Sequence, residues 1–230
     1  MKDNERSKLS RISAIKFMRD HTYDIIKEAI VSLKLRPGER LKVAELAREL
    51  GTSATPIRET LTRLEQEGLV KTIRFKGAFV AQIDEQDVEE IFELRELLEE
   101  AAVKKAATTF SSEDLRRAEA LLERMRMAYN TGDMDSYAKA SRDFHYLFIE
   151  KLKNQRMVSV LKTFNDQLER VRLTAIRTPK NIPLFIEDYA KILEALKAKN
   201  PRQAEKALVV HLKRAKDAFS KSSMHKKANQ

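Results

Sequence analysis

The 230-residue chain contains no cysteine, which excludes disulfide bonds and metal sites built from thiolates. It has no apolar run long enough to cross a membrane, and its polar start, MKDNERSKLS, lacks the apolar core of a signal peptide. Patterns that carry catalytic chemistry are missing as well: there is no Glu-x-x-His pair, no nucleophile with a partnered base and no glycine-rich phosphate loop. These absences argue against an enzyme and against a membrane protein, and they favour a soluble one.

The formal net charge of +10 is unevenly distributed along the chain. Residues 1–82 hold 17 Lys and Arg against 11 Asp and Glu, a net +6, whereas residues 83–220 hold 25 against 24, a net +1. A basic N-terminal third joined to a nearly neutral remainder suggests a nucleic-acid-binding domain followed by one that senses a ligand or dimerises. The length allows two small domains, each with its own core.

Two short helices around a tight turn are predicted over residues 43–68. The first has an apolar stripe at spacings of three and four residues and ends at Gly51, which accepts the left-handed conformation that closes a helix. The second is expected to have Pro56 at its first position, where a missing N–H is harmless. A helix whose first turns carry Thr and Arg on the outward face fits a DNA major groove, since its N-terminal dipole favours phosphate and Arg can bind a guanine edge.

A basic hairpin is predicted directly after the second helix, with strands over residues 69–73 and 78–81 around the turn Arg74-Phe75-Lys76-Gly77. A hairpin in this position is the wing of a winged helix-turn-helix. The segment PGERLKVAELARELGTSATPIRETLTRLEQEGLV, followed by KGAFVA, resembles the DNA-binding domain of GntR-type bacterial transcription regulators. The resemblance runs from about Tyr23 to Ile83 and implies a cytoplasmic protein that binds double-stranded DNA.

The resemblance also implies which side chains contact DNA. Arg58 matches the arginine of the family's P-[VI]-R-E motif, and the wing is expected to reach the minor groove or the DNA backbone. Ala54 stands where many relatives have a base-reading arginine, and Ala44 stands where some have another, so base readout is expected to differ from theirs. The expected DNA-contacting residues are Thr52, Ser53, Thr55, Arg58, Thr62, Arg63, Lys76 and Gly77.

The second half of the chain is predicted to be helical throughout. A long helix over residues 87–110 has Asp84 and Asp87 as candidate caps, and no strand pattern appears after Ile83. The expected fold is therefore mainly α, with an N-terminal winged helix-turn-helix followed by an all-helical antiparallel bundle of about six helices. The other expected helices cover residues 17–33, 112–130, 135–152, 155–178, 182–199 and 201–220. The expected divisions are a disordered tail at 1–15, the DNA-binding domain at 16–83, an effector-binding and dimerisation domain at 84–220, and a basic disordered tail at 221–230.

The segments ELRELLEEAAVKKAA, RDFHYLFIE, KILEAL and HLKRA, in this order, resemble the FCD class of GntR regulators, and six helices rather than seven favour its VanR-type branch. The resemblance implies a bundle that binds a small effector. Many members hold a divalent metal there with one Asp or Asn and three His, and the corresponding positions here are Ser141, His145, Tyr189 and His211. Since serine and neutral tyrosine are poor zinc ligands, no tight metal binding and no firm cofactor are expected, and His145 and His211 are only weak candidates.

Helical spacing supports an inward position for these four residues independently of the resemblance. They are interpreted either as core residues that hydrogen-bond one another and water, or as a pocket that binds an organic anion. Arg95 lies on the apolar stripe of its helix, where its guanidinium suits a carboxylate effector, although Glu96 or Glu99 could equally pair with it. The expected effector-binding residues are Arg95, Ser141, His145, Tyr189 and His211.

The sequence therefore predicts a DNA-binding transcription regulator controlled by a small organic acid. A homodimer that reads an inverted-repeat operator is expected, because one winged helix covers too few base pairs for useful specificity. Two alternatives remain open. One is a DNA-binding factor that works without an effector and keeps a degenerate ligand site. The other is an enzyme in the helical bundle.

Overall fold

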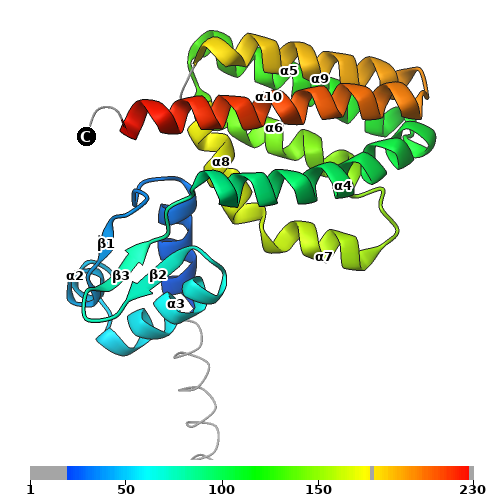
Figure 1. Ribbon diagram of the computed structural model, residues 1–230. Helices are drawn as coiled ribbons and strands as arrows, with labels where there is room; N and C mark the ends of the chain where they lie inside the picture. The colour runs from blue at the N-terminus through cyan, green and yellow to red at the C-terminus, as the bar shows by residue number, and fades with distance from the viewer. Residues whose placement is uncertain (1–19, 177–178, 228–230) are drawn as a thin grey trace, which may run out of the picture. The chain divides into compact units, whose positions relative to one another are not determined.

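The computed structural model describes residues 20–176 and 179–227, in which the chain forms two units divided between Ile83 and Asp84 (Figure 1). The first unit contains a helix over residues 20–31 and five further elements. The expected tail at 1–15 and the expected start of the first helix at Phe17 lie outside the described residues. The five elements are β1 (Arg40–Leu41), α2 (Val43–Glu49), α3 (Ala54–Gln66), β2 (Val70–Ile73) and β3 (Gly77–Val80).

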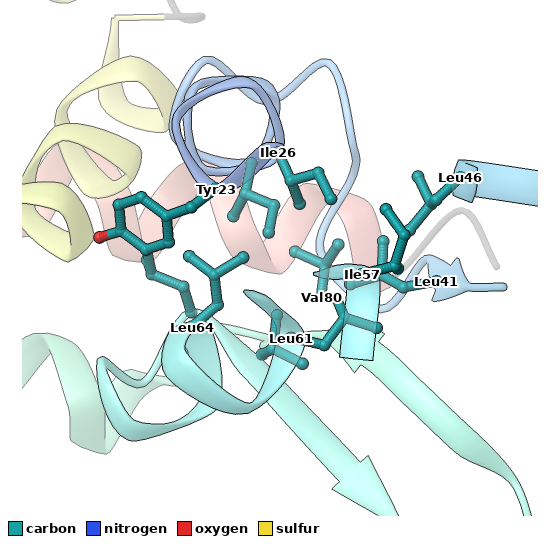
Figure 2. Packing of buried hydrophobic residues seen from close by; sticks show 11 residues of the cluster. Tyr23, Ile26, Leu41, Leu46, Ile57, Leu61, Leu64 and Val80 are labelled. Atoms are coloured by element: carbon teal, nitrogen blue, oxygen red, sulfur yellow. The ribbon is translucent and has the colours of Figure 1, made fainter. Parts of the chain in front are cut away.

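The apolar stripes of these elements meet in a single core (Figure 2). Tyr23 and Ile26 extend from the first helix toward Ile57 and Leu64 of α3, and all four side chains are buried. Leu46 of α2 closes the core on another side. Because α3 uses this stripe for packing, its opposite face is left to solvent.

The sheet has the order β1-β3-β2, and both pairings are antiparallel. Its β2–β3 hairpin is the predicted wing. The strand β1 was not predicted, because two residues are too few to show an alternating pattern. Between α2 and α3, Gly51 has φ +60°, as predicted. The position predicted for Pro56 was wrong: Ser53 is the N-cap and Pro56 is the third helical residue, still within the turn whose N–H groups have no helical partner.

The described part of the second unit is a helical bundle (Figure 1). Helix α10 packs against α4 and α9, and α5 packs against α6 and α9. In Figure 1, α4 and α10 lie side by side and run in opposite directions. Among the described residues, no helix is long and apolar enough to span a membrane. The helices are α4 (Glu85–Thr109), α5 (Ser112–Thr131), α6 (Met134–Ile149), α7 (Gln155–Thr163), α8 (Asn165–Ala175), α9 (Ile182–Lys197) and α10 (Pro201–Lys227), with a short 3-10 turn, η1 (Pro179–Asn181).

The prediction of a single helix over residues 155–178 is wrong. The segment divides at Phe164 into α7 and α8, so the described residues of this unit form seven α-helices. No glycine or proline lies between residues 155 and 176, so these residue types do not indicate an interruption of the helix. Phe164 is buried, and the bend lets Leu161 of α7 and Leu168 of α8 bury their side chains as well. The six-helix count that favoured the VanR-type branch therefore gives no support to that assignment.

Helix boundaries follow local capping. Asp84 is the N-cap of α4 and accepts from the Asp87 backbone N–H, while the Asp87 side chain accepts from the Asp84 N–H. Both residues were predicted as caps. Helix α10 extends to Lys227 and so covers most of the segment from residue 221 that was predicted as a tail; no glycine or proline interrupts it after Pro201. Residues 228–230 lie outside the described chain.

Candidate DNA interface and effector cavity

The outward face of α3 carries most of the residues predicted to contact DNA. Thr55, Arg58 and Thr62 are exposed, whereas Ile57 and Leu61 on the opposite face are buried. The Thr62 hydroxyl donates to the Arg58 carbonyl at 3.0 Å. Within the described part of the chain, the Arg58 guanidinium has no ion pair, so it is available to a phosphate or a guanine edge.

Arg63 is placed differently from Arg58. Its guanidinium lies 3.6 Å from the centre of the Tyr23 ring, and its Nε lies 3.4 Å from Glu67 Oε1. The Tyr23 hydroxyl donates to the same carboxylate at 2.7 Å. Arg63 thus joins α3 to the first helix, although about half of its side chain remains exposed. Of the two arginines predicted to contact DNA, only Arg58 is free of such internal contacts.

The wing presents a basic and apolar tip. Lys76 and Gly77, both predicted DNA contacts, are exposed, and so is Phe75, whose exposed fraction is 94%. Phe75 has φ +64°, and the Arg74 guanidinium lies 4.9 Å from its ring centre. Thr52 is half-buried and Ser53 is exposed at the start of α3. Phe75 was not predicted as a DNA contact, although its position in a four-residue turn between two strands indicates an exposed side chain.

All five predicted effector residues line one cavity in the second unit. Arg95 comes from α4, Ser141 and His145 come from α6, and Tyr189 and His211 come from α9 and α10. Each of these side chains is buried. The predicted convergence of two imidazoles and a phenol inside the bundle is therefore confirmed as geometry.

Glu99 is the partner of Arg95. Arg95 Nε donates to Glu99 Oε1 at 2.7 Å, and His145 Nδ1 lies 2.7 Å from Glu99 Oε2. Burial raises the pKa of Glu99, but the Arg95 charge and the His145 contact outweigh burial and hold that pKa well below its ordinary value. Glu99 is therefore an anion that neutralises Arg95 inside the bundle. From the sequence alone, Glu96 and Glu99 were equally possible partners of Arg95.

A chain of hydrogen bonds continues from Glu99 across the cavity. Burial lowers the pKa of His145 to about 3, even though Glu99 opposes this, so the imidazole is neutral at pH 7. Since Nδ1 faces the Glu99 carboxylate, we assign the proton to Nδ1, and Nε2 then accepts from the Tyr189 hydroxyl at 3.0 Å. The Ser141 hydroxyl lies 2.6 Å from the same oxygen and serves as its donor.

Two further polar groups at the cavity lack a hydrogen-bond partner in the described chain. The Tyr137 hydroxyl is buried on the cavity wall and has no hydrogen-bond partner in the described part of the chain. His211 Nδ1 is also without one, and it lies 3.8 Å from Asp188 Oδ2. Burial lowers the pKa of His211 below its ordinary value. The His211 ring centre lies 4.5 Å from that of Tyr189, so this imidazole packs directly against the hydrogen-bonded chain.

The donor set does not fit a tightly bound divalent metal. Ser141 and Tyr189 offer neutral oxygens, and His145 uses both ring nitrogens within the protein. In the described residues, no group of three or more His, Cys, Asp or Glu side chains is arranged to hold a metal ion. His145 and His211 have ring centres 5.3 Å apart, and the carboxylate beside His145, that of Glu99, is already bound by Arg95.

The cavity has a volume of about 30 Å³, which is room for one or two water molecules. Its walls also contain Arg172 of α8, whose guanidinium pairs with Glu169. An organic effector would therefore require the bundle to open. Tyr137 and Arg172 were not predicted from the sequence as residues of this cavity. Tyr137 lies four residues before Ser141 on the inward face of α6, and this spacing could have found it, whereas Arg172 was hidden by the undivided helix over 155–178.

Two family models match the chain. Residues 18–80 match the model described as bacterial regulatory proteins of the gntR family, and residues 90–214 match the FCD domain. The chain is 31% identical to the HTH-type transcriptional regulator McbR of Escherichia coli, over 72% of this chain and 76% of that protein. It is 28% identical to the HTH-type transcriptional regulator YdhC of Bacillus subtilis, over 82% of this chain and 85% of that protein.

Solved structures show the same fold. A GntR transcriptional regulator from Rhodococcus sp. RHA1 superposes with a TM-score of 0.75 at 22% identity and covers 87% of this chain and 96% of that one. The structure of Escherichia coli McbR gives a TM-score of 0.75 at 24% identity and covers 90% of this chain and 98% of that one. These relatives are transcription regulators and not enzymes, which removes the enzyme alternative.

Proposed function

Because the chain belongs to the GntR family of bacterial regulatory proteins, carries an FCD domain and is a DNA-binding transcription regulator, we propose that a homodimer reads an inverted-repeat operator under the control of a small effector. The cavity in the second unit is the proposed effector site. Such a protein acts in the cytoplasm, where the DNA is. The observation that carries the proposal is the convergence of five polar side chains from four helices on one buried cavity.

DNA contact is proposed for the exposed start of α3 and the wing. Arg58 is the proposed base-reading or phosphate-binding arginine, since it is exposed and has no ion pair in the described chain. For Arg63 we propose a smaller contribution to DNA binding than for Arg58, because its guanidinium already contacts Tyr23 and Glu67. Phe75 is added as an apolar contact at the wing tip. The other proposed contacts are Thr52, Ser53, Thr55, Thr62, Lys76 and Gly77.

The proposed effector is a small uncharged molecule with hydroxyl groups. The carboxylate expected from the sequence depended on a free Arg95, and Glu99 occupies that guanidinium. An acidic ligand that bound Arg95 in place of Glu99 would leave the buried Glu99 carboxylate without its main counter-charge. The free-energy cost would be about 3–5 kcal/mol. The cavity groups without a hydrogen-bond partner in the described chain are the Tyr137 hydroxyl and His211 Nδ1, and the Ser141 hydroxyl can still accept, so the site suits neutral donors and acceptors.

Effector control requires that the ligand bind two arrangements of the bundle unequally. A cavity of about 30 Å³ supports this requirement, because a ligand larger than water binds only an opened bundle. The ligand then stabilises the opened arrangement at the expense of the closed one. A change of this kind in a dimer alters the spacing of its two DNA-binding units and, with it, the affinity for an inverted repeat.

The test compares sugars and polyols with their corresponding sugar acids. Operator binding by gel shift and thermal unfolding are measured with each compound, for the natural protein and for Tyr137→Phe. The neutral member of a pair should change operator affinity, and Tyr137→Phe, which removes only the cavity hydroxyl, should weaken that response several-fold. A response to the acids alone restores the carboxylate hypothesis. If no compound acts and Tyr137→Phe binds DNA like the natural protein, the effector-independent alternative is favoured.

A further inference from the structure

The tip of the wing carries an exposed aromatic ring. Phe75 is 94% exposed, the largest exposed fraction of any large hydrophobic residue in the described chain, and it lies outside the core of the first unit. Its backbone has φ +64°, a left-handed conformation that is unfavourable for a residue with a bulky side chain and that glycine would adopt freely. The fold therefore gains nothing from a phenylalanine here, which points to a contact made outside the chain.

Basic side chains flank this ring. The Arg74 guanidinium lies 4.9 Å from the centre of the Phe75 ring, and the next residue, Lys76, is exposed. Neither Arg74 nor Lys76 forms an ion pair within residues 20–176 and 179–227. At the base of the same turn, a Cβ atom added to Gly77 would lie 3.7 Å from Arg40 Nε. An apolar ring between cations is complementary to double-stranded DNA, in which charged phosphates border grooves whose floor is made of stacked bases.

The wing is tied to α3, the helix proposed to contact DNA. Thr72 of β2 donates its backbone N–H to Glu65 Oε1 at 2.7 Å and its hydroxyl to Glu65 Oε2 at 2.8 Å. Glu65 belongs to α3, and Thr72 lies two residues before Arg74. This double hydrogen bond fixes the hairpin relative to α3. The ring is therefore held at one defined distance from the base pairs that α3 contacts.

We propose that Phe75 is a wedge that enters the minor groove next to the base pairs contacted by α3 and inserts partly between two of the neighbouring base pairs. The ring then replaces part of the stacking between those base pairs, Arg74 and Lys76 bind the phosphates on either side, and the duplex kinks at that step. Pyrimidine–purine steps unstack easily and A-tracts resist, so the wedge selects sequence where no hydrogen bond reads a base. This inference rests on the proposed DNA interface and adds how the wing contributes to specificity.

The fluorescence of 2-aminopurine, which rises when this base loses its stacking, tests the insertion. The DNA is an operator duplex selected by the natural protein from a random-sequence pool, with 2-aminopurine replacing one adenine at a time within and beside each half-site. The natural protein should raise the fluorescence at one step per half-site. Phe75→Ala should abolish the rise, and Phe75→Leu, which keeps an apolar side chain, should retain part of it. No rise at any position, or an undiminished rise with Phe75→Ala, overturns the inference.

Salt dependence separates a wedge from a purely electrostatic contact. Phe75→Ala should raise the dissociation constant for the selected operator roughly tenfold and leave its dependence on salt concentration unchanged, because no cation is lost. Lys76→Ala should reduce the slope of log K against log salt by about one for each bound wing and keep the fluorescence rise. An unchanged dissociation constant in Phe75→Ala contradicts the wedge.

A matched control removes an exposed apolar side chain elsewhere. Met127 is 60% exposed on α5 of the second unit, and Met127→Ala should bind the selected operator like the natural protein. Phe75→Ala and Phe75→Gly should not lower the midpoint of thermal unfolding, because the ring is not part of the core. If Arg58→Ala loses affinity and Phe75→Ala does not, only the wedge is wrong. If both variants bind like the natural protein, the proposed DNA interface is wrong as well.

Discussion

Arg58 and Arg63 lie five residues apart on α3 and are surrounded differently. Arg58 is exposed without an ion pair in the described residues, whereas Arg63 stacks on Tyr23 and pairs with Glu67. We predict that Arg58→Ala weakens operator binding by about 1–3 kcal/mol and leaves the midpoint of thermal unfolding unchanged. Gel-shift titration and thermal unfolding measure the two effects. Undiminished operator affinity in Arg58→Ala would remove this residue from the interface.

Arg63→Ala serves as the comparison on the same helix. Its loss removes a cation–π contact worth about 0.5–1 kcal/mol at an exposed site, so the free energy of unfolding of the first unit should fall by a similar amount. Arg63→Ala should weaken DNA binding less than Arg58→Ala does. A larger loss of affinity in Arg63→Ala than in Arg58→Ala would reverse the proposed roles.

The buried histidines predict a loss of stability in acid. The pKa of His145 is about 3 in the folded protein and near its ordinary 6.5 in the unfolded chain. Between these values the unfolded chain binds a proton that the folded protein does not, so the free energy of unfolding falls as pH is lowered from about 6.5. The slope approaches about 1.4 kcal/mol per pH unit for this histidine. His211, whose pKa is also lowered, acts in the same direction.

His145→Gln isolates this contribution. Urea unfolding at pH 7.5 and at pH 5 should show a smaller difference in free energy for the variant than for the natural protein. Glutamine can still donate to Glu99, which keeps the anion partly satisfied. An identical pH dependence in the two proteins would show that His145 is protonated in the folded state as readily as in the unfolded chain.

The cavity also predicts a gain of metal binding on substitution. Ser141→Asp with Tyr189→His supplies a carboxylate and a third imidazole beside His145 and His211, whose rings already lie close to Tyr189. Zinc or nickel should then bind stoichiometrically in calorimetry and raise the midpoint of unfolding. Tyr189→His alone is the control and should bind more weakly. Tight binding by the natural protein would contradict the assignment of the site as degenerate.

At the scale of single elements, α4 begins with a complete capping box between Asp84 and Asp87. Asp84→Ala should lower the free energy of unfolding of the second unit by about 0.5–2 kcal/mol, because the N–H of Asp87 loses its acceptor. Glu85→Ala, in the first turn but outside the box, should have a smaller effect. Urea unfolding followed by circular dichroism measures both, and equal losses would mean that charge near the helix start matters more than the cap.

Element by element, the sequence predicted the helices with strong local signals. Asp84 and Asp87 correctly predicted the start of α4, and Gly51 correctly predicted the turn between α2 and α3. It did not predict the division at Phe164, because no glycine or proline marks it and the N-cap of α8 is Phe164, which has no capping side chain. It also missed β1, whose two residues become a strand only by pairing with β3.

For the whole molecule, the proposed dimer makes a prediction about DNA. An operator with two half-sites should bind far more tightly than a single half-site, and the advantage should disappear when the half-sites are moved out of phase by half a helical turn. Sedimentation with and without DNA measures the oligomeric state. A complex of one chain with one half-site, of equal affinity to the inverted repeat, would contradict the dimer.

The sequence alone determined the two-part organisation, the winged helix-turn-helix and the inward position of His145, Tyr189 and His211. Apolar periodicity, helix caps and turn residues are local patterns, and each can be recognised from a few neighbouring positions in the sequence. Only the tertiary structure decided that Glu99, rather than an effector, binds Arg95, and that Tyr23 holds Arg63. Both contacts depend on which side chain lies within about 3–4 Å of the guanidinium. Helical spacing alone offers several possible partners for each arginine and does not show which one binds.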